Sequence, residues 1–277
     1  MEKERFAMED GEFMRLTYGK WMDIPITCYP NGEPVAPRES VWNDGCILMR
    51  PKSLQSFMVM RMWMASIPAP IRHSLTVFVP CLIGARQDRE TEANCLPVLH
   101  LFLKDIEAMG VREVVTLDPH SPASYLPNLK QMHLHVVAER LKAMRDPLAA
   151  PFTGVVAPDA GAGKRAEEFG KVFDVPVYHA WKRRDTRNGT LSNIGIEPVS
   201  DGYFLVVDDI CDGGATFLAV ADLLKRCDCA ADLYVSHGLF TKGTEALLKA
   251  FGFVYTTNST IGDKPGVHVI DVFGEGA

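Results

Sequence analysis

A pair of adjacent carboxylates followed by a glycine loop carries the most distinctive chemistry in this sequence. Asp208 and Asp209 follow residues 204–207, an apolar run typical of a parallel strand that is covered on both faces. The loop after the two acids contains Asp212, Gly213, Gly214, Ala215 and Thr216. Its glycines allow backbone N–H groups to approach an anion, and a helix that begins at Thr216 favours negative charge at its start. The pattern predicts a pocket in which the acids bind sugar hydroxyls and the loop binds a phosphate. The simpler alternative is a strand-to-helix turn with an N-cap.

A second polar segment, residues 81–89, follows a predicted strand at residues 74–79. It ends with Arg86, Gln87, Asp88 and Arg89. Guanidinium groups bind phosphate oxygens in bidentate fashion, and an amide beside them suits a base edge or a phosphate. The segment is therefore a candidate nucleotide-binding loop, and the alternative is a solvated charged loop.

Two further segments combine charges with turn residues. Asp159 lies in a glycine-rich turn between a predicted strand at residues 154–157 and a helix, where it would ligate Mg²⁺ or cap the helix. Lys182, Arg183 and Arg184 are consecutive cations that repel one another unless solvent or a polyanion neutralises them. Residues 181–188 are expected to form a loop, and most charge runs of this kind are simply solvated.

The first half of the chain holds two further candidate groups, a histidine after a strand and a turn near the amino terminus. His120 follows a predicted strand at residues 113–117, and by position alone it favours a structural role. Tyr29, Asn31 and Glu33 occupy a Pro-Asn-Gly turn. Their side chains would stack on a base and hydrogen-bond to it, but the same residues are equally typical of an ordinary turn.

The order of strand-like and helical patterns predicts an α/β protein with two similar domains, residues 1–148 and 149–277. A long helix is expected at about residues 129–144. The prolines of residues 146–151 make that stretch the best candidate for a linker.

Composition limits the class of protein. The chain has 277 residues, of which 47% are hydrophobic and 23% charged, so it can bury a substantial core. We expect a cytoplasmic protein, because no apolar run reaches the roughly 20 residues of a membrane span and the start lacks a signal-peptide pattern. The net charge of −6 gives no general reason to bind nucleic acid, and the odd count of seven cysteines suits free thiols.

These segments occur in the order found in the phosphoribosyl diphosphate (PRPP) synthetases, which are ribose-phosphate pyrophosphokinases, and cover roughly residues 25 to 272. Residues 204–216 resemble the PRPP loop of these enzymes and of type I phosphoribosyltransferases. Residues 81–89 are similar to the family's ATP-binding Gly-x-Ala-Arg-Gln-Asp-Arg segment, which phosphoribosyltransferases lack. Residues 29–33, 117–120, 157–166 and 181–188 resemble four other family segments.

The resemblance implies two phosphoribosyltransferase-like domains, each with a mainly parallel sheet flanked by helices, and the ATP side in the first domain. It implies magnesium-dependent transfer of the diphosphoryl group of ATP to ribose 5-phosphate, in a homo-oligomer with active sites near subunit interfaces. The implied catalytic residues are Lys182, Arg184 and His120, with His120 and Asp159 at the metal. The implied ATP-binding residues are Tyr29, Asn31, Glu33, Arg86, Gln87, Asp88 and Arg89, and the ribose and phosphate site comprises Asp208, Asp209 and residues 212–216.

Departures from the family pattern leave the acceptor open. Gly213 stands where the family's Asp-Thr-Gly-Gly-Thr or Asp-Thr-Ala-Gly-Thr loop has its first threonine, and this removes a hydroxyl donor and opens space. A 5-substituted ribose such as ADP-ribose is therefore an alternative acceptor. A PRPP-dependent glycosyltransferase and a noncatalytic regulatory relative are alternatives of other classes.

Overall fold

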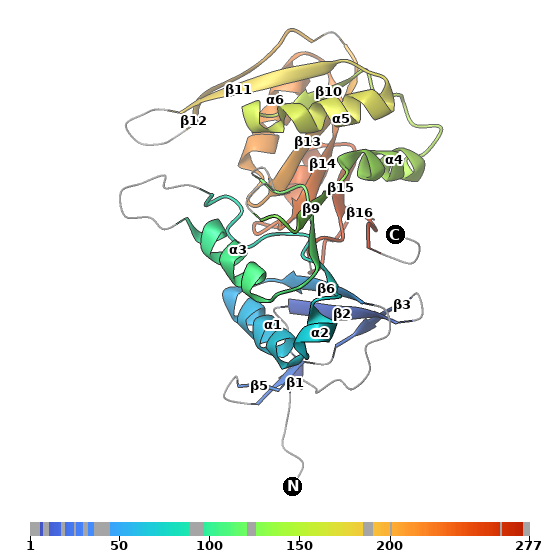
Figure 1. Cartoon of the computed structure of the whole chain (residues 1–277). Coiled ribbons are helices and arrows are strands. Elements are labelled where there is room, and N and C mark those ends of the chain that lie inside the picture. The colour runs from blue at the N-terminus through green and yellow to red at the C-terminus, as the bar shows by residue number, and fades with distance from the viewer. Residues whose placement is uncertain are drawn as a thin grey trace. The chain divides into compact units, whose positions relative to one another are not determined.

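The computed structural model describes residues 6–7, 11–17, 20–24, 26–29, 33–35, 45–88, 97–120, 126–184, 191–199, 201–260 and 262–273. Contacts divide the chain into two units (Figure 1). The first comprises Met1–Met132, Ser259–Ile261 and Phe273–Ala277, and the second comprises His133–Asn258 and Gly262–Val272. The α/β class predicted from the sequence is confirmed, since each unit contains a mainly parallel sheet with helices packed on it.

The change from one unit to the other falls between Met132 and His133, earlier than the expected position after residue 148. Helix α4 (Leu134–Met144) belongs to the second unit because its apolar side packs against helix α5 (Gly163–Phe173). Val137, Ala138 and Leu141 form the buried side of α4. The candidate linker at residues 146–151 therefore lies within the second unit, and the assignment of an ATP side and a ribose side to the two halves remains a prediction.

The first unit is built on a six-stranded sheet of order β3–β2–β6–β7–β8–β9 in the described residues. Its strands are β2 (Gly11–Thr17), β3 (Lys20–Asp23), β6 (Cys46–Pro51), β7 (Thr76–Phe78), β8 (Glu113–Leu117) and β9 (Leu129–Met132). Its helices are α1 (Leu54–Ser66), α2 (Ala69–Arg72) and α3 (Val98–Ala108), and a small separate sheet contains β1 (Phe6–Ala7), β4 (Thr27–Cys28) and β5 (Pro34–Val35). Strands β6 to β9 are parallel, whereas β2 runs antiparallel to both β3 and β6.

Strand β9 corrects the sequence prediction of one long helix at residues 129–144. Residues 129–132 pair in parallel with β8, and the helix begins only at Leu134. The pairing satisfies backbone groups along the edge of β8, which would otherwise stay open. Local helical spacing gave no sign of this long-range pairing.

The second unit has a seven-stranded sheet of order β12–β11–β10–β13–β14–β15–β16 in the described residues. Its strands are β10 (Gly154–Ala157), β11 (Val177–Arg184), β12 (Leu191–Ile196), β13 (Tyr203–Cys211), β14 (Ala230–Gly238), β15 (Val254–Thr257) and β16 (His268–Ile270). Besides α4 and α5 it contains the 3₁₀ turn η1 (Ala160–Ala162), α6 (Ala215–Arg226) and α7 (Glu245–Ala250). All neighbouring strands are parallel except the pair β11 and β12.

The order in which strands are added to the sheet reverses between the parallel strands β10 and β13. From β10 the crossover through α5 leads outward to β11, whereas from β13 the crossover through α6 leads to β14 on the other side. Because such crossovers are right-handed, α5 and α6 cover opposite faces of the sheet. The carboxyl ends of β10 and β13 therefore flank a topological switch point, the place where open α/β sheets bind ligands.

The core of the second unit confirms the buried strand predicted at residues 204–207. These four residues are completely buried, as are Val155 and Val156 of the neighbouring strand. Burial of each such side chain stabilises the fold by about 1.5–3 kcal/mol relative to an exposed one. The switch point is thus held on a rigid support.

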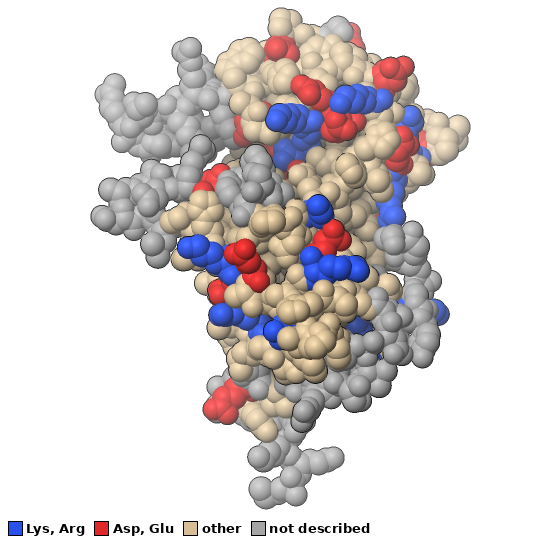
Figure 2. All heavy atoms as spheres, in the orientation of Figure 1, with Lys and Arg blue, Asp and Glu red and all other residues tan. Residues whose placement is uncertain are grey.

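The surface is mixed in charge. Figure 2 shows acidic and basic side chains intermingled over the described part of one face. Within the described residues, each helix is too short or too polar to cross a bilayer.

A buried carboxylate anchors the amino-terminal end of β13. Asp232 is completely buried, and its Oδ1 accepts hydrogen bonds from the Tyr203 hydroxyl and, at 2.9 Å, from the Phe253 backbone N–H. Burial raises the pKa of Asp232, and the hydrogen bonds and the Arg145 guanidinium oppose that effect. The same guanidinium lies 4.0 Å from the centroid of the Phe152 ring. Arg145 and Phe152 flank residues 146–151, so these contacts attach both ends of that stretch to the sheet near the start of β13.

We expect Tyr203→Phe to lower the free energy of unfolding by about 1.5–3 kcal/mol, because Asp232 loses a donor in a buried place. Urea unfolding measures the change. Tyr178→Phe in the same unit is the control, since the Tyr178 ring packs edge-on against Phe204, and it should change stability by less than about 0.5 kcal/mol. Equal effects of the two substitutions would show that Asp232 does not depend on Tyr203.

Candidate functional site

The two adjacent acids lie on strand β13 itself. The sequence placed them at the carboxyl end of a strand whose apolar run is residues 204–207, and β13 extends two residues beyond them to Cys211, with Asp208 opposite Val235 and Ile210 opposite His237 of β14. Parallel pairing with β14 outweighs the low strand propensity of aspartate. The carboxylates are therefore positioned by the sheet and not by a loop.

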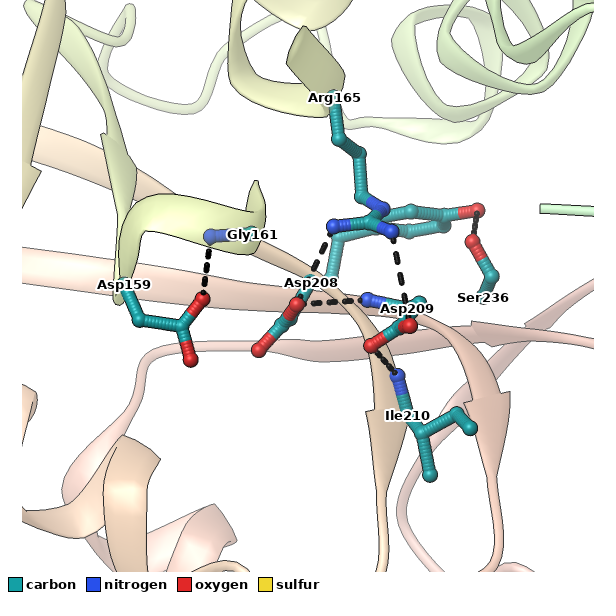
Figure 3. A network of polar contacts seen from close by, with 8 residues as sticks. Asp159, Gly161, Arg165, Asp208, Asp209, Ile210 and Ser236 are labelled. Carbon is teal, nitrogen blue, oxygen red and sulfur yellow. Dashed lines mark hydrogen bonds and ion pairs between the residues drawn. The ribbon is translucent and has the colours of Figure 1, made fainter. Parts of the chain in front are cut away.

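Arg165 joins the two carboxylates (Figure 3). Its Nη1 lies 3.2 Å from Oδ1 of Asp208, and its Nη2 lies 3.6 Å from Oδ2 of Asp209. Arg165 comes from α5 and is 7% exposed, and Asp209 is 5% exposed. One buried cation thus faces two acids, so the cluster retains an excess of negative charge when both acids are ionised.

Backbone donors hold the carboxylates in place. Oδ1 of Asp208 accepts a hydrogen bond from the Asp209 N–H at 2.9 Å, and Oδ1 of Asp209 accepts one from the Ile210 N–H at 2.7 Å (Figure 3). With Arg165 on the other side, these bonds restrict the side-chain rotamers. The acids therefore form a preorganised pair of acceptors, which suits the recognition of two neighbouring hydroxyl groups.

The charge excess perturbs Asp208. Burial, followed by the negative charge of Asp209, raises the pKa of Asp208 to about 8, although Arg165 acts in the opposite direction. Asp159 contributes to the increase through its own charge. A bound cation or a set of hydroxyl donors would relieve this repulsion, and perturbed carboxyls of this kind are typical of functional sites.

Asp159 stands after β10, on the other side of the switch point. It is the N-cap of η1, and its Oδ1 accepts a hydrogen bond from the Gly161 N–H at 3.0 Å (Figure 3). The capping role considered from the sequence is therefore confirmed. Because the charge of Asp159 also acts on Asp208, capping does not remove it from the acidic cluster.

The acidic cluster fits some metal ions better than others. In the described part of the chain, no three His, Cys, Asp or Glu residues are grouped as ligands of one ion. Zinc usually requires such a set, whereas Mg²⁺ takes one or two carboxylates and completes its shell with water and substrate phosphates. Asp159 and Asp208 fit the latter pattern.

The glycine loop leads from β13 into α6. Gly214 is the N-cap of α6 and has φ +77°, a conformation that a residue with a side chain adopts only with strain, and the helix begins at Ala215, one residue before the predicted start. Asp212 is tied to the segment after β14, because its backbone oxygen accepts a hydrogen bond from the Thr241 N–H at 3.1 Å and its side chain accepts one from the Thr241 hydroxyl. The N–H groups of the first turn of α6 are thereby available to bind an anion.

Polar residues of β14 and β15 link these two neighbouring strands. The Gly238 N–H donates to Oγ1 of Thr256 at 2.9 Å, and the Thr257 hydroxyl donates to the backbone oxygen of Ser236 at 2.7 Å. All four residues are buried or lie in buried strand positions. Their role is to hold the strands together beside the candidate site.

The residues predicted to bind ATP lie in the first unit. Arg86 and Gln87 are exposed in a turn in which the Gln87 N–H donates to the Gly84 oxygen at 2.7 Å, and Asp88 follows them. His120 is exposed just after β8, and the Tyr29 N–H donates to the Glu33 oxygen at 2.9 Å in a turn. Asn31 and Arg89 lie outside the described residues. The roles of all these residues, including the sharing of a metal by His120 and Asp159, remain predictions.

The cationic segment is partly a strand. Residues 181–184 end β11, where Lys182 pairs with Ile194 and Arg184 with Leu191 of the antiparallel strand β12. The sequence predicted a loop from residue 181 onward, but strand pairing reaches Arg184. The side chains of Lys182 and Arg184 and the whole of residues 185–190 lie outside the described part of the chain, so their catalytic roles remain predictions.

Arg165 is the site residue to which the sequence reasoning gave no role. A signal for it exists, because Arg165 comes three residues after Ala162 and four before Phe169, on the apolar stripe of α5. An arginine on a buried helical face requires a carboxylate partner.

We expect Arg165→Met to lower the free energy of unfolding by about 3 kcal/mol at pH 9, because it leaves two carboxylates buried without their cation. The loss should shrink as the pH falls toward 5. The folded-state pKa of Asp208 lies above its ordinary value, so folding favours the protonated acid there, and protonation relieves the repulsion.

Urea unfolding at both pH values measures this effect. Arg226→Met is the matched control, since Arg226 forms an exposed ion pair with Asp222 on α6 and should contribute less than about 1 kcal/mol. A loss that is the same at pH 5 and pH 9 would contradict the interpretation.

Comparisons with known proteins identify relatives of this chain. A ribose-phosphate pyrophosphokinase of Mesorhizobium japonicum is 30% identical over 217 residues, which cover 73% of this chain and 69% of the relative. Ribose-phosphate pyrophosphokinase A of Dictyostelium discoideum is 28% identical over 172 residues, and the ribose-phosphate pyrophosphokinase of Mycoplasma genitalium is 29% identical over 198 residues. These matches cover 61% and 67% of this chain, but only 54% and 58% of the two relatives.

A solved structure agrees with these relatives in fold. The phosphoribosylpyrophosphate synthetase of Mycobacterium smegmatis matches with a TM-score of 0.72 and 21% identity, over 88% of this chain and 84% of that chain. No protein-family model matches the sequence. The identity to the Mesorhizobium japonicum protein and the shared fold lead to one conclusion: this chain belongs to the ribose-phosphate pyrophosphokinase family.

Proposed function

We propose that this chain transfers the β,γ-diphosphoryl group of ATP to the anomeric hydroxyl of ribose 5-phosphate, giving PRPP and AMP. The observation that carries the proposal is the pair Asp208 and Asp209, held by Arg165 at the switch point and followed directly by a loop with an open helix start. Family membership supplies the reaction type. The acid pair and loop supply the acceptor site.

The acceptor is recognised by two kinds of group. The carboxylates of Asp208 and Asp209 accept hydrogen bonds from the 2- and 3-hydroxyls of the ribose, and backbone N–H groups of residues 212–216 bind the 5-phosphate. Arg165 does not need to touch the sugar, because it fixes the two carboxylates. Such fixed contacts at both ends of the ribose orient its anomeric hydroxyl.

The transfer requires positioning more than strong acid or base catalysis. The anomeric oxygen forms a bond to the β-phosphorus, the bond from that phosphorus to the bridging oxygen of AMP breaks, and the hydroxyl proton passes to solvent. Lys182 and Arg184 stabilise the charge that develops on the transferring group, and Tyr29, Glu33 and residues 86–89 bind ATP. Asp159 would be one of the ligands of Mg²⁺, which would neutralise phosphate oxygens when bound.

The proposal extends to assembly. Family membership suggests a homo-oligomer in which active sites lie near subunit interfaces. Light scattering coupled to size-exclusion chromatography measures the mass of the particle. A mass equal to that of one 30.7 kDa chain under assay conditions would remove this part of the proposal.

We expect the protein, mixed with Mg²⁺, ATP and ribose 5-phosphate, to release AMP and form a sugar with a diphosphate on C1. Mass spectrometry and ³¹P NMR identify both products. ADP-ribose is the comparison acceptor, and a reaction with it in place of ribose 5-phosphate would contradict the acceptor proposed here. No AMP with either acceptor would contradict the reaction.

We expect Lys182→Ala to slow AMP formation at least about 100-fold, because a charge that stabilises the transition state is lost. Lys171→Ala is the matched control, since Lys171 forms an exposed ion pair with Glu168 on α5. Its rate should stay within about twofold of the unaltered protein. Equal rates for the two variants would refute the role of Lys182.

A further inference from the structure

The turn after β14 runs alongside the start of the glycine loop. The Leu239 and Phe240 N–H groups donate to the Cys211 oxygen at 2.9 and 3.0 Å, and the Thr241 N–H donates to the Asp212 oxygen at 3.1 Å. A further bond, from the Gly243 N–H to the Phe240 oxygen at 2.9 Å, closes the turn. Lys242 lies between Thr241 and Gly243, so these backbone bonds hold it beside Gly213.

The stem of Lys242 lies against the face of Gly213. A Cβ atom at Gly213 would meet Cδ and Cε of Lys242 at 3.3 Å each, which is tighter than an ordinary contact. The lysine stem thus takes the space that a side chain at residue 213 would need. The Lys242 ammonium is bonded directly to Cε, one of the two atoms in this contact.

We propose that Lys242 is a specificity-determining residue that binds the phosphoryl group at the C5 end of the acceptor. This inference rests on the proposed function, because it uses the same acceptor site. With glycine at position 213 the loop has no side-chain hydroxyl donor there, and Lys242 supplies a charged donor from the neighbouring turn. Residues 213 and 242 act as a pair in which a small residue at one position makes room for the cation at the other.

Local charges are consistent with this role. The Thr241 hydroxyl donates a hydrogen bond to the Asp212 carboxylate, and the Glu245 carboxylate lies against Gly243. A phosphate at the start of α6 would receive backbone N–H donors from the loop and a strongly hydrated point charge from Lys242. The alternative is a solvated lysine whose stem only packs on Gly213.

Direct binding separates the two possibilities. Isothermal titration with ribose 5-phosphate in the presence of Mg²⁺ should give a Kd about 5- to 20-fold weaker for Lys242→Met than for the unaltered protein, because a hydrogen bond to a charged group is lost. Lys249→Met is the control. Lys249 is exposed on α7, beside Lys225 at the far end of α6 from the loop, and its loss should change the Kd less than twofold.

A double-mutant cycle tests the pairing itself. Gly213→Thr should weaken binding of ribose 5-phosphate in the presence of Lys242, whose stem occupies the space. In the Lys242→Gly background the same threonine should restore binding at least about threefold, because its hydroxyl then has room to donate. A lysine with only a packing role gives Lys242→Gly the Kd of the unaltered protein, so there is no loss for the threonine to restore. Circular dichroism confirms that each variant is folded.

Each outcome bears on the inference. An unchanged Kd for Lys242→Met, an equal loss for Lys249→Met, or additive effects in the cycle would overturn it. Binding that depends on Lys242 in a protein that releases no AMP would support the inference and refute the proposed reaction. AMP release with no effect of Lys242 would do the reverse, and no binding of ribose 5-phosphate by the unaltered protein would overturn both.

Discussion

The site depends on the compensation of two carboxylates that lie on consecutive residues of a buried strand. Water is largely excluded there, so each negative charge requires a partner, and Arg165 serves both. The guanidinium is suited to this task because its planar fork presents donors in two directions at once. Helix α5 must in turn keep its position over β10 and β13, and that position follows from the apolar stripe around Ala166 and Phe169.

The charge of Arg165 compensates the negative charge of the acidic cluster only in part, and this leaves a reason for the cluster to bind a cation or hydroxyl donors. A structural ion pair would balance its charges, whereas this one holds two acids, and a third at Asp159, against one arginine. The excess charge costs stability in the isolated protein and is relieved by donors or cations from outside. Functional sites commonly carry such a cost, and the fully buried strand core beneath the acids offsets it here.

Much of this arrangement could be predicted from local sequence. Residues 113–117 and 154–157 form the strands expected of them, and the acids and glycines at residues 208–216 lie together as the pattern indicated. The failures involve pairing between distant segments. The extension of β13 to Cys211, strand β9 and the hairpin of β11 and β12 all depend on hydrogen bonds to another strand, which side-chain periodicity does not report. Arg165 was missed for a related reason, since its meaning comes from partners 43 and 44 residues away in the chain.

Because β13 continues through the two acids, the candidate site has two parts. The acids lie within the sheet, and the glycine loop lies beyond it, where substitutions are less constrained. Hydrogen bonds between β13 and β14 fix the positions of Asp208 and Asp209, whereas Gly213 and the turn at Lys242 lie beyond the end of this pairing. Substitutions in the loop or the turn therefore reshape one end of the pocket without moving the acids. A family built on this scaffold can change the ligand that it accepts at that end while the two carboxylates keep their positions.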